Sequence, residues 1–137
     1  MEFTYTEAKE LINEIGRFEE SSYDYYGLTV LEVGNNEYAI GTEDEANKAS
    51  HEYIENSVWA FTANFLASMT EMPYEIFETL QPQCESSNEP ILACIERTCG
   101  IDEFVEEAIS ADGRGHFLSG YDGFETDIGD LVMFRIN

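Results

Sequence analysis

Negative charge is spread along the whole of this sequence, and that distribution restricts what the chain can fold into. Residues 1–42 have a net charge of −7, residues 43–80 a net charge of −7 and residues 81–137 a net charge of −9. Since no segment is a separable acidic tail, the carboxylates must cover a folded body. Their mutual repulsion opposes compaction, so such a chain needs a substantial apolar core.

Residues that can form this core are plentiful. Hydrophobic residues make up 43% of the chain and aromatic residues 13%, whereas disordered acidic segments are poor in aromatic and branched side chains. A length of 137 residues is typical of one domain. We therefore expect a single acidic globular domain over residues 1–137.

Cysteine usage and hydropathy favour a cytoplasmic location. Cys84, Cys94 and Cys99 are an odd number of thiols, and their spacing matches neither a disulfide framework nor a zinc site. No basic-plus-apolar signal opens the sequence, and no run approaches the ~18 apolar residues of a membrane span. We expect reduced thiols and no membrane association.

Helical periodicity covers most of the sequence. A capping box at Thr4 and Glu7 predicts a first helix, and a second capping box at Thr42 and Glu45 begins a predicted long helix that ends near Met69. Shorter helices are predicted in three further ranges: 73–80, 88–100 and 102–109.

Two strand pairs complete the predicted fold. Leu28–Val33 and Glu37–Gly41 flank Gly34-Asn35-Asn36, a turn typical of hairpins. His116–Ser119 and Leu131–Ile136 form a second predicted pair around a glycine-rich loop. The predicted class is α+β: several helices around one long central helix, with a small antiparallel sheet from an N-terminal hairpin and a C-terminal strand pair.

Evidence for catalysis or metal binding is sparse. His116 lies near Asp112 and Arg114, as a general base would, but its position beside a turn favours an ordinary strand residue. The loop Asp122–Asp130 places Phe124 where an EF-hand needs an oxygen ligand. We expect no enzyme activity, no cofactor and no metal, and leave a small cation-binding protein or enzyme as the least favoured alternative.

Acidic residues at helical spacing form the candidate binding surface. Lysine partners at i+4 are almost absent, although solvated helices usually mix both signs. A DNA strand carries one phosphate per ~3.4 Å, so rows of carboxylates along a helix approach its charge density. The predicted partner-binding residues are the acids of these rows: Glu7, Glu10, Glu14, Glu52, Glu55, Glu71, Glu75, Glu78, Asp102, Glu103, Glu106 and Glu107.

With these acidic rows, the chain resembles the DNA-mimic inhibitors of phages and mobile elements, of the anti-restriction and anti-CRISPR type. The stretch Gly113-Arg114-Gly115-His116-Phe117-Leu118-Ser119-Gly120-Tyr121-Asp122-Gly123 also looks like part of small phage and plasmid proteins. The resemblance implies a protein that blocks the basic DNA- or RNA-binding site of a partner inside a bacterial host cell. It implies no direct binding to nucleic acid.

A second hypothesis relies on aromatic contacts. Aromatic side chains are enriched at protein interfaces, and this chain could serve as an acidic adaptor or structural module, with a homodimer compatible with either hypothesis. The candidate apolar interface consists of Tyr23, Tyr25, Tyr26, Tyr121 and Phe124.

Overall fold

The computed structural model describes residues 19–20 and 24–137, which form two compact units. The described residues up to Glu52 and those from Asp112 onward belong to a sheet-containing unit, and Tyr53–Ala111 form a helical unit. The predicted first helix lies outside the described residues. The elements are β1 (Glu19–Glu20), β2 (Thr29–Val33), β3 (Asn36–Thr42), α2 (Glu43–Glu55), η2 (Val58–Ala60), α3 (Ala63–Thr70), α4 (Tyr74–Leu80), η3 (Gln81–Ser87), α5 (Asn88–Glu96), α6 (Ile101–Asp112), α7 (Arg114–Leu118), β4 (Thr126–Ile128) and β5 (Leu131–Arg135).

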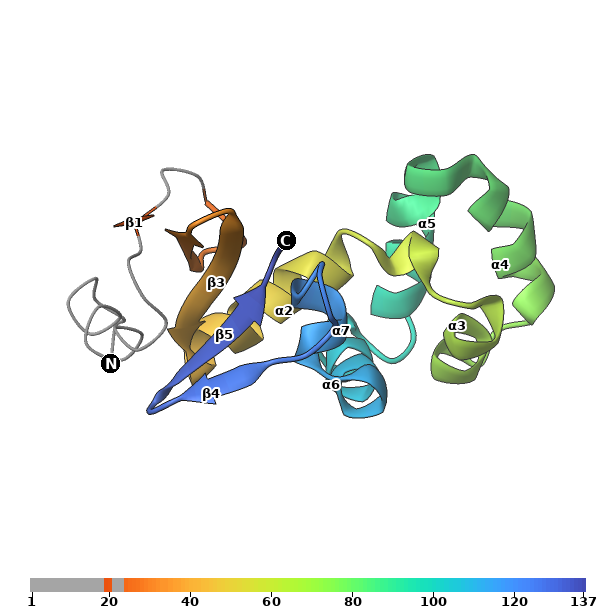
Figure 1. Cartoon of the computed structure of the whole chain (residues 1–137). Coiled ribbons are helices and arrows are strands. Elements are labelled where there is room, and N and C mark those ends of the chain that lie inside the picture. The colour runs from red at the N-terminus through yellow and green to blue at the C-terminus, as the bar shows by residue number, and fades with distance from the viewer. Residues whose placement is uncertain (1–18, 21–23) are drawn as a thin grey trace. The chain divides into compact units, whose positions relative to one another are not determined.

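The sheet joins the two ends of the sequence, as predicted. Its strand order is β1-β2-β3-β5-β4, and every neighbouring pair is antiparallel (Figure 1). The β2–β3 hairpin turns at Gly34, whose φ of +64° is easily reached by glycine. β3 then pairs with β5, so that Ile40 lies opposite Met133. The α+β class and the origin of the sheet are therefore confirmed.

Both faces of the sheet carry buried apolar side chains. On one face Leu31, Ile40, Leu131 and Met133 form a cluster against which Tyr38 and Ile128 pack. Because side chains alternate along a strand, the opposite face is formed by another buried set: Val30, Ala39, Val132 and Phe134.

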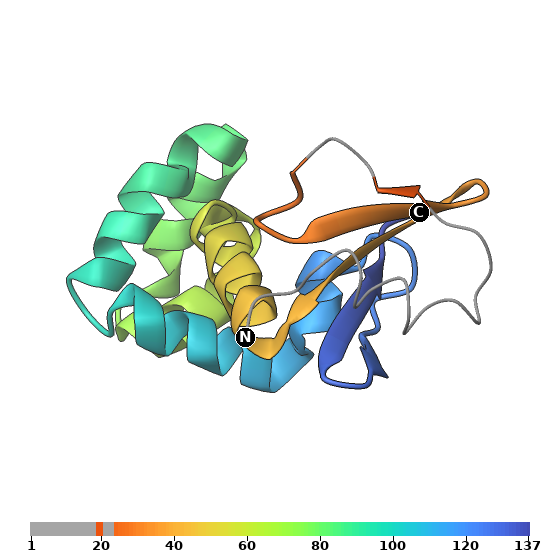
Figure 2. The same cartoon turned by 90° about the vertical axis from the view of Figure 1, so that its left-hand side faces the viewer.

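Helix α2 begins where β3 ends (Figure 2), at the predicted capping box. The amide of Thr42 donates to the Glu45 carboxylate at 2.9 Å, and the amide of Glu45 donates to the Thr42 hydroxyl at 3.2 Å. Glu43 and Asp44 add negative charge at the positive end of the helix dipole. A local sequence signal was sufficient here.

The prediction that this helix continues to Met69 is wrong, because α2 ends at Glu55. The side-chain amide of Asn88 donates to the carbonyl oxygen of Glu55 at 3.0 Å, and its Oδ1 accepts from the amide of Trp59 at 3.3 Å. Gln81 also donates to the carbonyls of Trp59 and Phe61. Polar residues distant in sequence thus satisfy the backbone that the break exposes.

Aromatic packing supplies much of the core of the helical unit. The rings of Phe61, Phe65 and Phe104 lie 5.0–5.5 Å apart between centroids, two of the pairs edge to face. Such pairs are favourable beyond the area they bury. Among the fully buried side chains around this unit are Ile54, Leu66, Phe77, Ile91 and Ile95.

Two other sequence predictions are wrong. The expected loop from Gln81 to Asn88 is a 3-10 segment, η3, interrupted at Cys84, where φ is +54°. The expected strand His116–Ser119 is largely helix α7, and β5 pairs instead with β4. Gly115 of α7 lies directly against the following loop, since a Cβ there would lie 2.6 Å from the carbonyl oxygen of Gly123. None of the helices in the described ranges is both long and apolar enough to cross a membrane.

Candidate functional site

Helix α6 presents an acidic outer face along its first half. Asp102, Glu103, Glu106 and Glu107 are all exposed, while Phe104, Val105 and Ala108 are buried on the other side. Pairs of acidic residues alternate with pairs of apolar residues at the spacing of a helical turn. Formation of the helix therefore places the acidic side chains on one face and the apolar side chains on the other. The predicted helix over 102–109 is thus confirmed and extends from Ile101 to Asp112.

The charge density of this face lies between that of a single DNA strand and that of duplex DNA. Asp102 and Glu107 are separated by a rise of about 7.5 Å along the helix axis, so the four carboxylates have a mean axial spacing of roughly 2.5 Å. Double-stranded DNA carries one charge per ~1.7 Å, and each of its strands one per ~3.4 Å. The acidic face keeps this density over little more than one helical turn.

The row predicted from Glu71, Glu75 and Glu78 does not lie on one helix. Glu71 is the C-cap of α3 with a left-handed φ of +60°, whereas Glu75 and Glu78 lie on α4. Pro73 separates them, since its missing amide hydrogen and fixed φ suit a helix start. All three side chains remain exposed.

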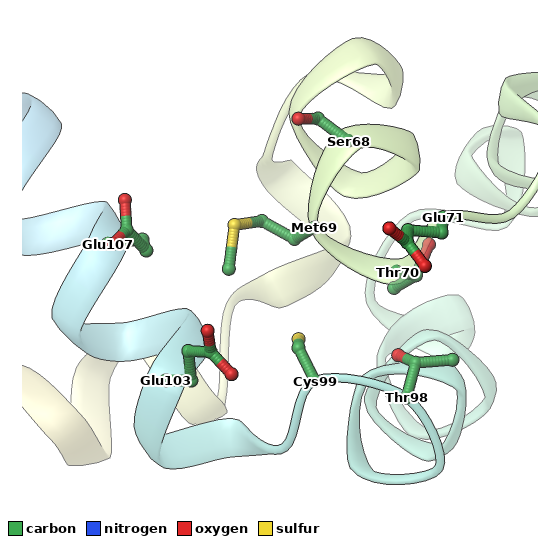
Figure 3. A pocket seen from close by; sticks show the side chains of 8 residues that line it. All are labelled: Ser68, Met69, Thr70, Glu71, Thr98, Cys99, Glu103 and Glu107. Carbon is green, nitrogen blue, oxygen red and sulfur yellow. The ribbon is translucent and has the colours of Figure 1, made fainter.

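A groove of about 490 Å³ brings Glu71 together with two acids of α6 (Figure 3). Met69 projects from α3 towards α6, and Cys99 points into the same gap, which Glu103 and Glu107 border on the α6 side. The remaining lining residues are polar: Ser68, Thr70 and Thr98. The acidic rows predicted from helical spacing had placed Glu71 apart from Glu103 and Glu107.

The groove lies in a part of the chain that has almost no basic residues. Residues 53–111 contain eleven Asp and Glu against one base, Arg97. Burial raises the pKa of the Cys99 thiol, and the charge of Glu103 acts in the same direction, so a neutral thiol borders the carboxylates at neutral pH. Three acids and no base line this space, an arrangement that suits a lysine or arginine side chain.

Sequence reasoning missed Met69 and Cys99 as site residues. Neither has a sequence signal that distinguishes it from an ordinary core residue, because the groove exists only where the end of α3 approaches α6. The i, i+4 pair Glu103 and Glu107 was detectable, since such spacing places both on one helix face.

The remaining predicted acids are scattered. Glu52 is exposed on α2 and Glu55 is half-buried at the end of that helix. Glu7, Glu10 and Glu14 lie outside the described residues.

The residues of the predicted aromatic patch differ in how far they are buried. Tyr25 donates from its hydroxyl to the carbonyl of Leu118 at 2.8 Å and packs edge to face on Tyr26, so both rings are half-buried. Tyr121 and Phe124 are 59% and 71% exposed. Tyr23 lies outside the described residues.

A second acidic cluster in the sheet-containing unit is organised around an arginine. Glu43, Glu125 and Asp127 bring carboxylate oxygens within 4.8 Å of one another. The Arg114 guanidinium pairs with Glu43 at 2.8 Å and with Glu125 at 2.7 Å, so a cation is already supplied by the chain. His116 is exposed on α7, and the Asp122 carboxylate accepts hydrogen bonds from Ser119 and the amide of Phe124.

Comparison with known proteins gives no relative from which to transfer a role. No family model, curated protein or solved structure matches the chain.

Proposed function

We propose that this chain is an acidic binding protein that occupies the basic DNA- or RNA-binding site of a partner protein by mimicking nucleic acid. The acidic face of α6 and the adjoining groove carry the proposal. It implies a counter-defence inhibitor of the anti-restriction or anti-CRISPR type, acting without cofactor in the cytoplasm of a bacterial host.

The acidic face of α6 destabilises its own helix, and this energetic cost supports a functional role. Asp102 with Glu106 and Glu103 with Glu107 are like-charge i, i+4 pairs, each of which disfavours an isolated helix by about 0.2–0.5 kcal/mol. A helix face that only had to be soluble could equally carry acidic and basic residues in alternation. The residues 53–111 instead have eleven acids and one base.

The groove adds a geometric element to the charge. Glu71 lies on one side and Glu103 with Glu107 on the other, while Met69 and Cys99 offer apolar surface to the methylene stem of a lysine or arginine. Long basic side chains bind in this way, with the stem on apolar surface and the charge among acceptors. Lysines and arginines that neutralise phosphates are the groups this site would neutralise.

The test compares two variants with the same change in net charge. The variant E103Q/E106Q/E107Q removes three charges from α6, and the control E32Q/E85Q/E89Q removes three exposed charges elsewhere. Each is immobilised and used to capture proteins from a bacterial lysate, with elution by duplex DNA at constant ionic strength or by salt alone.

We expect a partner that DNA elutes, at least tenfold weaker binding to the α6 variant and less than threefold weaker binding to the control. Binding should fall steeply with ionic strength, as electrostatically steered association does. Equal losses in both variants, or a partner that DNA does not displace, would contradict nucleic-acid mimicry by α6.

A further inference from the structure

The most exposed large apolar side chain in the described residues belongs to a loop that is held from several sides. Phe124 is 71% exposed and Tyr121 59% exposed, although this chain buries Phe77, Phe104 and Phe134 completely. Both exposed rings lie between α7 and β4 in the sheet-containing unit. Exposed aromatic residues of this size are enriched at protein interfaces.

Hydrogen bonds fix the first half of this loop. The buried Ser119 hydroxyl lies 2.9 Å from the Asp122 carboxylate and 2.7 Å from the carbonyl oxygen of Arg135 on β5. The amide of Phe124 donates to the same carboxylate at 3.0 Å, and this bond holds the pKa of Asp122 below its usual range. The guanidinium of Arg135 lies 3.5 Å from the centroid of the Tyr121 ring.

Packing and an ion pair fix the second half. A Cβ on Gly115 would lie 2.6 Å from the carbonyl carbon of Phe124, so α7 approaches the loop backbone directly. Glu125 is held by Arg114. None of these contacts uses the Phe124 ring.

We propose that the loop formed by residues 119–125 is a preformed anchor that binds a basic amphipathic segment of another protein. The apolar residues of that segment contact Phe124 and Tyr121. Because the loop is already ordered, binding loses little conformational entropy, which is how rigid aromatic anchors reach useful affinity.

The negative charge around the loop favours a basic segment as its binding partner. Glu125 directly follows Phe124 and clusters with Glu43 and Asp127 around the single charge of Arg114, while near Tyr121 the charge of Arg135 offsets that of Asp122, which leaves a local excess of two negative charges. Lysines and arginines beside the apolar residues of the segment would compensate it. A second copy of this chain is a poor occupant, because its net charge of −23 would repel the first.

This surface is independent of the α6 groove and of nucleic-acid mimicry. The test uses the full chain and a displayed library of random 16-residue peptides, selected at 0.3 M salt to reduce non-specific attraction. Selected peptides are then measured against F124S, F124L and the control Y74S, which removes an exposed tyrosine from α4.

We expect selected peptides to combine large apolar residues with lysine or arginine and to bind F124S at least tenfold more weakly. F124L should retain most of the affinity and Y74S should stay within twofold of the wild type. Peptides that bind F124S as well as the wild type, or a library that yields no binders, would overturn the proposal.

Two further measurements distinguish a binding role of the Phe124 ring from a structural role and from self-association. The melting temperature of F124S should stay close to that of the wild type, and a drop of more than 5 °C would assign the ring a structural role instead. Sedimentation of the wild type should show a monomer, whereas dimers that F124S abolishes would identify a second copy as the occupant and refute the basic segment.

Discussion

Replacement of Arg114 by alanine should selectively destabilise the sheet-containing unit. The side chain is 11% exposed and pairs with Glu43 of α2 at 2.8 Å and with Glu125 before β4 at 2.7 Å. Its Nε also donates to Glu125 at 3.0 Å and its Nη1 to Asn47 at 3.0 Å. One ordered guanidinium therefore connects α7, α2 and the approach to β4.

The expected magnitude follows from this geometry. An exposed ion pair contributes up to about 1 kcal/mol, but bidentate pairs that share one ordered arginine exceed that value. Removing Arg114 also leaves three carboxylates within 4.8 Å of one another without a counter-charge. We expect the free energy of unfolding to fall by about 2–3 kcal/mol and the melting temperature by roughly 6–12 °C.

Urea denaturation at pH 7 and low salt provides the assay. R97A removes an exposed arginine with the same change in net charge and is the matched control. R114K keeps the charge but not the fork of donors, so it should recover about half of the loss. A double-mutant cycle with E43Q should give a coupling of at least ~0.5 kcal/mol. If R114A and R97A have the same stability, the arginine does not hold this unit together.

The pH dependence gives a second check. The hydrogen bond from Arg114 lowers the pKa of Glu43. The stabilisation of the folded state by this pair is therefore fully present above the pKa of an unfolded glutamate, about 4.3. It is lost as the pH falls through the lower pKa of the folded state. The difference in stability between wild type and R114A should therefore shrink between pH 5 and pH 3.

Two further outcomes are expected. Gly115→Ala should cost about 2 kcal/mol or more in urea denaturation, because its Cβ would lie 2.6 Å from backbone atoms of the loop; Gly120→Ala, at 3.0 Å from one carbonyl oxygen, should cost less, and equal costs would contradict the packing argument. Cys99 should react more slowly with iodoacetamide at pH 8 than the exposed Cys84, because burial raises its pKa. Peptide mass spectrometry measures both rates, and equal rates would refute the burial of Cys99.

Local signals predicted the parts of the fold that local interactions decide. The Thr42–Glu45 capping box lies within four residues, and the hairpin turn at Gly34 needs only its own backbone freedom. The end of α2 could not be predicted in this way, since Asn88 caps it from 33 residues away. The apolar periodicity continues through the break because α3 also needs an apolar face.

The candidate site shows the same division. The acidic face of α6 follows from a pattern of adjacent residues, with Phe104 and Ala108 inward and Glu103 and Glu107 outward. The groove could not be predicted, because it depends on where the end of α3 stops after Glu71 takes a left-handed conformation. The packing of α7 against the loop that follows it, where Gly115 leaves room for the loop backbone, is likewise a contact that no local pattern indicates.

The order in which the sheet is completed has a consequence during synthesis. β3 ends at Thr42 and β5 begins at Leu131, so 88 residues must be made before that pairing is possible. At 5–20 residues per second this takes roughly 4–18 s, during which one edge of β3 has no strand beside it. Open strand edges recruit other chains, and charge is a common defence. Repulsion between the negative charges of neighbouring nascent chains would keep those chains apart until β5 has been synthesised.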